Sequence, residues 1–347
     1  MPEDQIAKLH AGKGAVGHPL TRVSGRDIDA TVLSGRLALG SYRAGACETL
    51  LNENSLHVDW LAGSSVGAVN AALVAGSSRD QQIGVLRQFW FNGNSAPIDL
   101  MMPAYPRHAL KWLSALRARL LGAAGHFWPR LPDGALSSFR SFYDLAPMRH
   151  RLEELIDFSC LNDGPIRLSI AATDIETGEL VIFDTRKGDR IGIDHILASC
   201  GLLPEFAPVQ IGGRLLGDGG LCANAPIEAL FDEIGDEDLT FVIDLFARDG
   251  IRPNSLEEAV ERKNDLMFGN QTFARLQAYC DSGKLGNVLY LSYRPMSDEA
   301  GPEKLFDFSA GSLNSRWDAG SADMIEALSR LPLGRSPRLN VIRRNAR

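Results

Sequence analysis

The sequence predicts an α/β fold with a mainly parallel central sheet flanked by helices, and three observations support this prediction. Near the N-terminus, short apolar runs alternate with segments of helical spacing in the order strand, helix, strand, helix. The chain has 347 residues, and 45% of them are hydrophobic, which excludes a disordered chain and suffices for one large domain with insertions or for two domains. It contains no internal repeat and no low-complexity tract.

The predicted elements begin at residue 28. Residues 28–33 (IDATVL) and 58–62 are short apolar runs and therefore predict buried strands. Residues 41–52 predict a helix with a small face that allows close packing, and residues 66–75 predict a helix of small residues. Later strands are predicted at residues 166–173, 180–184, 239–245 and 288–291. Later helices are predicted at residues 146–156, 194–200, 226–234, 256–282 and 321–331.

Net charge and cysteine content exclude several classes of protein. Thirty-six Lys and Arg residues against 43 Asp and Glu residues give a net charge of −7, so we expect no nucleic-acid partner. The chain has no run of 18 apolar residues, and residues 1–20 do not resemble a secretory signal. The cysteines are spread too widely for a zinc site or a disulfide framework, so we expect reduced thiols and a cytoplasmic location. They are Cys47, Cys160, Cys200, Cys222 and Cys280.

Residues 100–132 differ in character from the rest of this acidic chain. They contain five basic residues and no acidic one, and leucines recur at helical spacing beside two tryptophans and a phenylalanine. A basic amphipathic helix with aromatic neighbours can lie on an anionic membrane surface. The alternative is a cap helix that packs on the core of the protein and exposes its basic face to water.

A G-x-S-x-G pattern, from Gly63 through Ser65 to Gly67, follows a predicted strand and precedes a predicted helix. A serine on such a turn presents its hydroxyl to a pocket, and the N-terminus of the following helix favours the negative charge that develops during ester cleavage. The pattern therefore predicts a nucleophile at Ser65. The alternative is a serine in an unrelated turn.

A serine nucleophile needs a base, and the histidines supply few candidates. An α/β-hydrolase places its histidine late in the chain, whereas His195 is the last histidine here. His195 is kept as the one candidate for a triad. The other candidate base is Asp218, which lies in a G-D-G-G sequence with an apolar environment, although an aspartate in a loop is often only a turn former.

Three blocks in this order resemble the patatin-like phospholipases, which are lipid acyl hydrolases with a Ser–Asp dyad. Residues 33–45 resemble the glycine-rich oxyanion loop with its helix, residues 59–70 the nucleophile turn, and residues 198–226 the block that carries the family's aspartate. Together the resemblance covers residues 28–234. Residues 306–320 resemble a C-terminal extension of some bacterial members.

The resemblance implies a role for individual residues and a division into domains. Ser65 would be the nucleophile and Asp218 its base, without a metal or another cofactor. The oxyanion would be held by backbone N–H groups of Gly35, Arg36 and Leu37, with that of Val66 as a further candidate. The motif glycines are Gly63, Gly67, Gly219 and Gly220. We expect an N-terminal tail (1–27), a patatin-like hydrolase domain (28–245) with a cap insertion at about 95–140, and a C-terminal helical extension (246–347).

The oxyanion loop departs from the family pattern. The family usually has three glycines there, and this chain has Arg36 and Leu37 in place of two of them. If these positions need a positive φ, the substitutions cost about 1–2 kcal/mol each and can turn an N–H group away from the site. If they do not, the oxyanion hole survives, and Arg36 shapes the pocket or contacts an anionic head group.

Four hypotheses about function remain open at this stage. The first is a hydrolase of lipid esters that acts in the cytoplasm or at the inner face of the membrane, with contact through residues 100–132. The second is a carboxylesterase or thioesterase for short acyl groups or a polyester. The third is a catalytically impaired protein that binds acyl lipids, and the fourth is a Ser65–His195 triad enzyme. Acyl chain length, head group and oligomeric state are not predicted.

Overall fold

The computed structural model describes residues 29–92, 107–130, 141–231, 233–235, 238–250, 252–283, 286–294, 301–331, 333 and 339–342. Within these residues a nine-stranded sheet has the order β11-β10-β9-β1-β2-β5-β8-β7, and β6 also pairs with β5. The strands are β1 (Asp29–Leu33), β2 (Trp60–Ser64), β5 (Arg167–Asp174), β6 (Leu180–Asp184), β7 (Val209–Ile211), β8 (Arg214–Asp218), β9 (Leu239–Asp244), β10 (Asn287–Ser292) and β11 (Leu339–Ile342).

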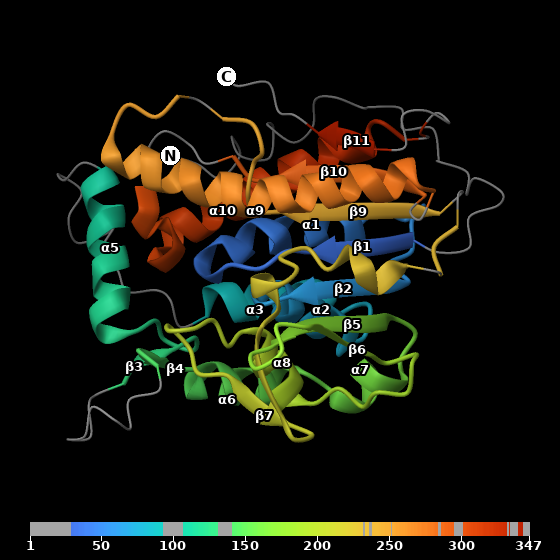
Figure 1. Ribbon diagram of the computed structural model, residues 1–347, viewed down its shortest axis with the longest axis horizontal. Coiled ribbons are helices and arrows are strands. Elements are labelled where there is room, and N and C mark those ends of the chain that lie inside the picture. Colours follow the sequence, from blue (N-terminus) through green and yellow to red (C-terminus); the bar gives the residue numbers. More distant parts are fainter. Residues whose placement is uncertain are drawn as a thin grey trace, which may run out of the picture.

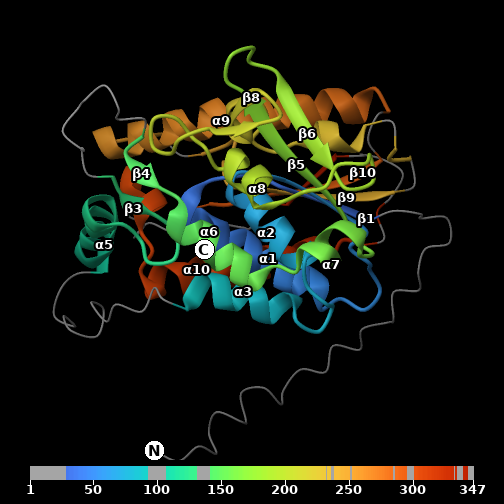
Figure 2. The same cartoon turned by 90° about the horizontal axis from the view of Figure 1, so that it is seen from below.

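Helices cover both faces of this sheet, with α9 on one face and α1, α2, α3 and α10 on the other (Figures 1 and 2). The described helices are α1 (Gly40–Leu51), α2 (Val66–Ala75), α3 (Gln82–Phe91), α5 (Arg107–Leu121), α6 (Ala146–Leu155), α7 (Phe158–Asp163), α8 (Ile193–Ser199), α9 (Leu256–Asp281) and α10 (Ala310–Leu328). Short 3₁₀ helices are η2 (Leu37–Leu39), η4 (Gly219–Leu221), η5 (Ile227–Leu230) and η6 (Gly301–Phe306). A small separate hairpin joins β3 (Trp128–Pro129) and β4 (Tyr143–Asp144).

The central strands are apolar along their whole length because both of their faces are buried. Leu61, Phe241 and Leu289 pack into the core beneath α1, α2 and α10. Their sequence neighbours Trp60 and Val242 pack into a second core beneath α9 and η5. The predicted α/β fold with a mainly parallel sheet is confirmed, since all described pairs from β11 through β5 in the sheet order are parallel.

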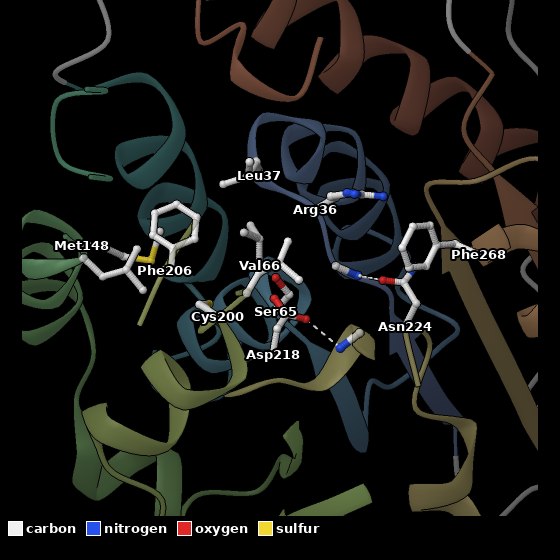
Figure 3. A pocket seen from close by; sticks show the side chains of 14 residues that line it. Arg36, Leu37, Ser65, Val66, Met148, Cys200, Phe206, Asp218, Asn224 and Phe268 are labelled. Atoms are coloured by element: carbon white, nitrogen blue, oxygen red, sulfur yellow. Dashed lines mark hydrogen bonds between the residues drawn. The ribbon is translucent and has the colours of Figure 1, made fainter. Parts of the chain in front are cut away.

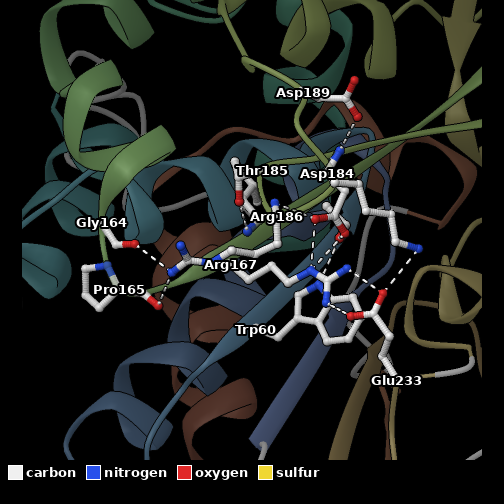
Figure 4. Close-up of polar contacts among 12 residues, drawn as sticks. Trp60, Gly164, Pro165, Arg167, Asp184, Thr185, Arg186, Asp189 and Glu233 are labelled. Carbon is white, nitrogen blue, oxygen red and sulfur yellow. Dashed lines mark hydrogen bonds and ion pairs between the residues drawn. The ribbon is translucent and has the colours of Figure 1, made fainter.

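The antiparallel strands β6, β7 and β8 join this sheet at β5. An ion-pair network fixes the β5–β6 edge, with Arg167 between Asp184 and Glu233 and stacked 3.6 Å above the ring centroid of Trp60 (Figure 4). Ser169 donates to Asp184 at 2.6 Å and accepts from the Trp60 indole at 2.8 Å. The network therefore links β2, β5 and β6 through hydrogen bonds in addition to those of the backbone.

Several elements differ from the sequence-based expectations. The predicted helix at 226–234 is wrong, because only the short 3₁₀ helix η5 forms there. Phe231 has an extended backbone and ends the helical turn. Helix α10 begins at Ala310 rather than at residue 321, since the Ser309 hydroxyl accepts from the Ser312 N–H and caps an earlier start. The β7–β8 hairpin and helix α3 were not predicted. Residues 246–347 contribute β10 and β11 to the central sheet as well as helices, and residues 1–27 lie outside the described residues.

None of the described helices combines the length and the apolar character that a membrane span requires. The predicted cap insertion at about 95–140 is described only in part. Its helix α5 packs on η6, with Arg119 stacked 4.5 Å from the ring centroid of Phe306.

Helices α1 and α10 approach so closely that side chains are excluded at two glycines. A Cβ at Gly320 would lie 1.8 Å from the carbonyl oxygen of Tyr42, and a Cβ at Gly45 would lie 2.0 Å from that of Trp317. We expect Gly320→Ala to lower the free energy of unfolding by about 1–3 kcal/mol, because the helices must separate. Urea unfolding measures this loss.

Gly84→Ala is the matched control, since Gly84 is exposed on α3 and a Cβ there meets nothing within 4 Å. Alanine is the better helix former, so this variant should gain about 0.5–1 kcal/mol. Equal losses at the two positions would contradict the close-packing interpretation.

Candidate active site

Ser65 lies on the sharp turn between β2 and α2. Its backbone angles, φ 54° and ψ −132°, are unusual for a residue other than glycine. Two hydrogen bonds hold the turn, because the Ser65 N–H donates to the Ser199 hydroxyl at 2.8 Å and that hydroxyl donates to the carbonyl of Ala171 at 2.6 Å. The Ser65 side chain is 7% exposed and lines a cavity. Such a strained residue, held in place by its surroundings, is typical of a functional site.

Asp218 is the last residue of β8, and strand register brings it to Ser65. Ser64 lies opposite Ala171 on β5, and Asp218 lies opposite the next residue of β5, Ala172. Figure 3 shows the side chains of Ser65 and Asp218 together at the centre of the cavity, and the Ser65 side chain acts on the pKa of the Asp218 carboxyl.

Burial raises the pKa of Asp218 to about 6. The Ser65 side chain, the backbone N–H of Gly220 at 2.6 Å, and the positive charges of Arg36 and Arg43 act in the opposite direction and favour the carboxylate. Asp218 is therefore more basic than an ordinary aspartate yet ionised at neutral pH. These are the properties required of a general base.

Glycines at the site permit the close approach of backbone segments. A Cβ at Gly35 would lie 2.2 Å from the Cβ of Ser65, and a Cβ at Gly67 would lie 2.2 Å from the carbonyl oxygen of Leu33. The structure also excludes a Cβ at Gly63, Gly219 and Gly220, where it would lie within 3 Å of another atom. None of these five glycines has a positive φ. Glycine is therefore required at these five positions because there is no space for a Cβ, and not because the backbone is left-handed.

The loop predicted to hold the oxyanion contains one residue in the left-handed region. Arg36 is extended, with φ −177°, whereas Leu37 has φ 31°. The N–H of Gly35 donates to Oδ1 of Asn224 at 3.3 Å. Among the described residues, none accepts from the N–H groups of Arg36, Leu37 or Val66. Three of the four predicted donors are therefore available, and the fourth is engaged by Asn224, a residue that the sequence analysis did not assign to the site.

The cavity beside Ser65 is small. Its free volume is about 30 Å³, room for one or two water molecules. Apart from Ser65 and Asp218, it is lined by Gly35, Arg36, Leu37, Val66, Leu145, Met148, Cys200, Leu202, Phe206, Gly220, Asn224 and Phe268.

A family model of patatin-like phospholipases matches residues 31–231, which is more than half of the chain. The chain belongs to the patatin-like phospholipase family. The matched region contains both Ser65 and Asp218 and ends before β9, α9, β10 and α10.

The comparison with solved structures matches VipD and the type III effector protein ExoU at low sequence identity. VipD from Legionella pneumophila is 15% identical with a TM-score of 0.38, and the match covers 85% of this chain and 67% of VipD. The type III effector ExoU is 14% identical with a TM-score of 0.41, and the match covers 88% of this chain. This chain spans about half of ExoU, 54% of its length. The search of curated proteins found no match.

His195 and Ser65 do not lie together in this patatin-like site. His195 is on α8, where its Nδ1 accepts from the N–H of Gly192 at 3.0 Å and its ring packs against Phe183. It does not line the cavity of Ser65. The structure therefore gives no support to the Ser65–His195 triad. Among the residues that the structure describes, no group of His, Cys, Asp and Glu is arranged to hold a metal ion.

Arg43 is a second cation near the site that the sequence analysis did not identify. It is fully buried on α1, and its three guanidinium nitrogens have no hydrogen-bond partner among the described residues. Burial lowers its pKa to about 9. A Cβ at Gly67 would lie 2.7 Å from its Nη1, so the guanidinium packs against the turn that carries Ser65.

The hydroxyl of Ser199 should stabilise the turn that carries Ser65 far more than the hydroxyl of Ser64 does. Ser199→Ala leaves the Ser65 N–H and the Ala171 carbonyl without a buried partner, so we expect a loss of about 2–3 kcal/mol in the free energy of unfolding. The Ser64 hydroxyl is equally buried but has no partner, so Ser64→Ala should cost less than about 0.5 kcal/mol. Urea denaturation of both variants tests the difference, and similar losses would contradict it.

Proposed function

We propose that this protein is a serine acyl hydrolase that cleaves carboxylic ester bonds of lipids through a Ser65–Asp218 dyad. The observation that carries the proposal is the position of Ser65 beside a buried Asp218, both of which line one cavity. Membership of the patatin-like phospholipase family supports the same reaction class.

The proposed reaction proceeds through an acyl-enzyme. Ser65 Oγ attacks the ester carbonyl while Asp218 accepts its proton, and the proton then passes to the departing alcohol. A water molecule attacks the acyl-enzyme, with Asp218 again as the base, and releases the fatty acid. The backbone N–H groups of Arg36, Leu37 and Val66 would hold the oxyanion, assisted by the N-terminus of α2. No step uses a metal or another cofactor.

The size of the cavity favours a second candidate, a carboxylesterase or thioesterase for short acyl groups. A free volume of about 30 Å³ does not admit a long acyl chain. A lipid chain would enter only after side chains of the apolar wall move, among them Met148, Leu202 and Phe206. Activity across a series of acyl chain lengths distinguishes the two candidates.

Hydrolysis of nitrophenyl esters, from short to long acyl chains, tests the dyad. Ser65→Ala should abolish turnover and labelling by a fluorophosphonate, and Asp218→Asn should lower kcat by about 10²–10⁴-fold because the general base is lost.

The pH dependence of the same hydrolysis gives a second test. Below about pH 6 the Asp218 carboxyl becomes protonated and cannot accept the proton of Ser65. The value of kcat/KM should therefore fall about tenfold per pH unit below about pH 6.

Ser64→Ala and His195→Ala are the controls for this experiment, and both should keep the turnover of the wild type. Loss of turnover in His195→Ala with full activity in Asp218→Asn would replace the dyad by the histidine triad. A folded wild type without turnover or labelling would favour a protein that binds acyl lipids without cleaving them.

We also propose that α5 contacts an anionic membrane, with the protein at its cytoplasmic face. The buried side of α5 consists mainly of small residues, whereas Trp112, Leu113, Leu120 and Leu121 are at least 40% exposed. Arg117 is exposed on the same helix. Exposed apolar side chains next to basic ones are typical of helices that lie in a membrane interface.

The double variant Leu120→Glu, Leu121→Glu should weaken binding to phosphatidylglycerol vesicles at least about tenfold, because it removes apolar area and adds negative charge. Ile325→Glu on α10, which is also an exposed apolar position, is the control and should bind as the wild type does. Vesicle co-sedimentation measures both. Equal binding by all three proteins would show that α5 does not contact the membrane.

A further inference from the structure

Arg36 lies in the wall of the active-site cavity and forms no direct ion pair, although the charges of Asp218, Glu205 and Asp265 act on it from a greater distance. Its guanidinium lies 4.5 Å from the ring centroid of Phe268 and 5.3 Å from that of Phe246, two rings that pack against each other. Its Nη1 is buried and has no hydrogen-bond partner, and no residue in the described part of the chain forms an ion pair with Arg36. Stacking on aromatic faces leaves the N–H groups at the edge of a guanidinium free to bind an anion.

Two other partly buried arginines, Arg167 and Arg275, are paired with carboxylates. Arg167 contacts two carboxylates, and Arg275 contacts Glu228 and the carbonyl of Ala225. Arg43 is also without a partner, but it is sealed in the core and does not line the cavity. Arg36 is therefore distinguished by two properties together, an unpaired guanidinium and a position on a cavity that contains Ser65 and Asp218.

The walls of this cavity differ on the two sides of Ser65. Figure 3 shows Met148 and Phe206 on one side, and Arg36, Asn224 and Phe268 on the other, with Ser65 and Asp218 between them. The first side suits the acyl part of an ester because it is apolar. The second side suits the alcohol part, provided that this part carries polar or charged groups.

We infer that Arg36 binds a phosphate group on the alcohol side of the ester and so selects phosphate-bearing esters over neutral ones. This inference rests on the proposed function. A guanidinium and a phosphate form two parallel hydrogen bonds, which a neutral glycerol ester does not offer. The long side chain of Arg36 reaches this position from the loop that also supplies candidate oxyanion donors. Arg36 would thus be a specificity-determining residue in a position where the family usually has glycine.

The test compares two monomeric substrates with the same acyl chains, dihexanoylphosphatidylglycerol and dihexanoylglycerol. Arg36→Met keeps a long unbranched side chain beside Phe246 and Phe268 but removes the guanidinium and its charge. Fatty acid release is measured at about pH 8, where Asp218 is ionised in both proteins, because loss of the Arg36 charge also raises the pKa of Asp218. We expect the ratio of kcat/KM for the phosphate ester to kcat/KM for the neutral ester to fall about 10–100-fold, because any effect of the substitution on the oxyanion loop or on Asp218 acts on both esters alike.

Arg36→Lys, which keeps the charge without the bidentate geometry, should give an intermediate value for the phosphate ester. Equal losses for both esters in Arg36→Met would overturn the inference and leave the proposed function intact. Inorganic phosphate distinguishes a site for the free anion. Inorganic phosphate that inhibits hydrolysis of the neutral ester by the wild type but not by Arg36→Met is bound by Arg36. If the wild type then shows no preference for the phosphate ester over the neutral one, the site binds free phosphate and the inference is wrong.

If neither ester is hydrolysed, the proposed function fails by itself, and binding then decides the inference. Calorimetric titration with glycerol 3-phosphate should give heat with the wild type and none with Arg36→Met. No heat with either protein would overturn the inference.

Discussion

The register of strand β5 is the constraint on which the candidate site depends. One edge of β5 pairs first in parallel with β2, which places Ser64 opposite Ala171, and then antiparallel with β8, which places Asp218 opposite Ala172, while β6 pairs with the other edge. Ala171 also accepts from the hydroxyl of Ser199, which in turn holds the N–H of Ser65. A shift of one residue in either pairing would turn the side chains of that strand to the opposite face and separate the two groups. The proposed nucleophile and its candidate base are therefore both positioned by strand β5.

The electrostatics of the site balance burial against nearby positive charge. Burial raises the pKa of Asp218, whereas the Ser65 side chain, the N–H of Gly220 and then the charges of Arg36 and Arg43 lower it, so that the pKa is about 6. A fully buried, unpaired Arg43 is unfavourable for folding because its charge has lost its hydration. The fold tolerates this cost at a position where the charge acts on the carboxylate. A neutral residue at position 43 would remove that cost and also make Asp218 harder to ionise.

The sequence predicted the parallel core and the order of its first four elements, because buried strands and small-residue helices leave strong local patterns. Ser65 was predicted from a local motif, whereas Asp218 was one of two candidate bases until the family resemblance favoured it, and the structure brings Ser65 and Asp218 together. The β7–β8 hairpin was not predicted, although Gly212 and Gly213, both with positive φ, are a recognisable turn signal between two apolar runs. In contrast, no local pattern indicates that Asn224 engages the N–H of Gly35, since the two residues meet only through the tertiary fold.

The family match and the sheet do not end at the same residue. The matched region stops at residue 231, yet β9 pairs with β1 along its whole length, and β10 and β11 continue the sheet beyond it. A fragment limited to the matched region would expose β1, a buried apolar strand, as an open edge available for pairing with other chains. The segment that follows the family region therefore covers an edge of the sheet that would otherwise be open to pairing between copies of the chain.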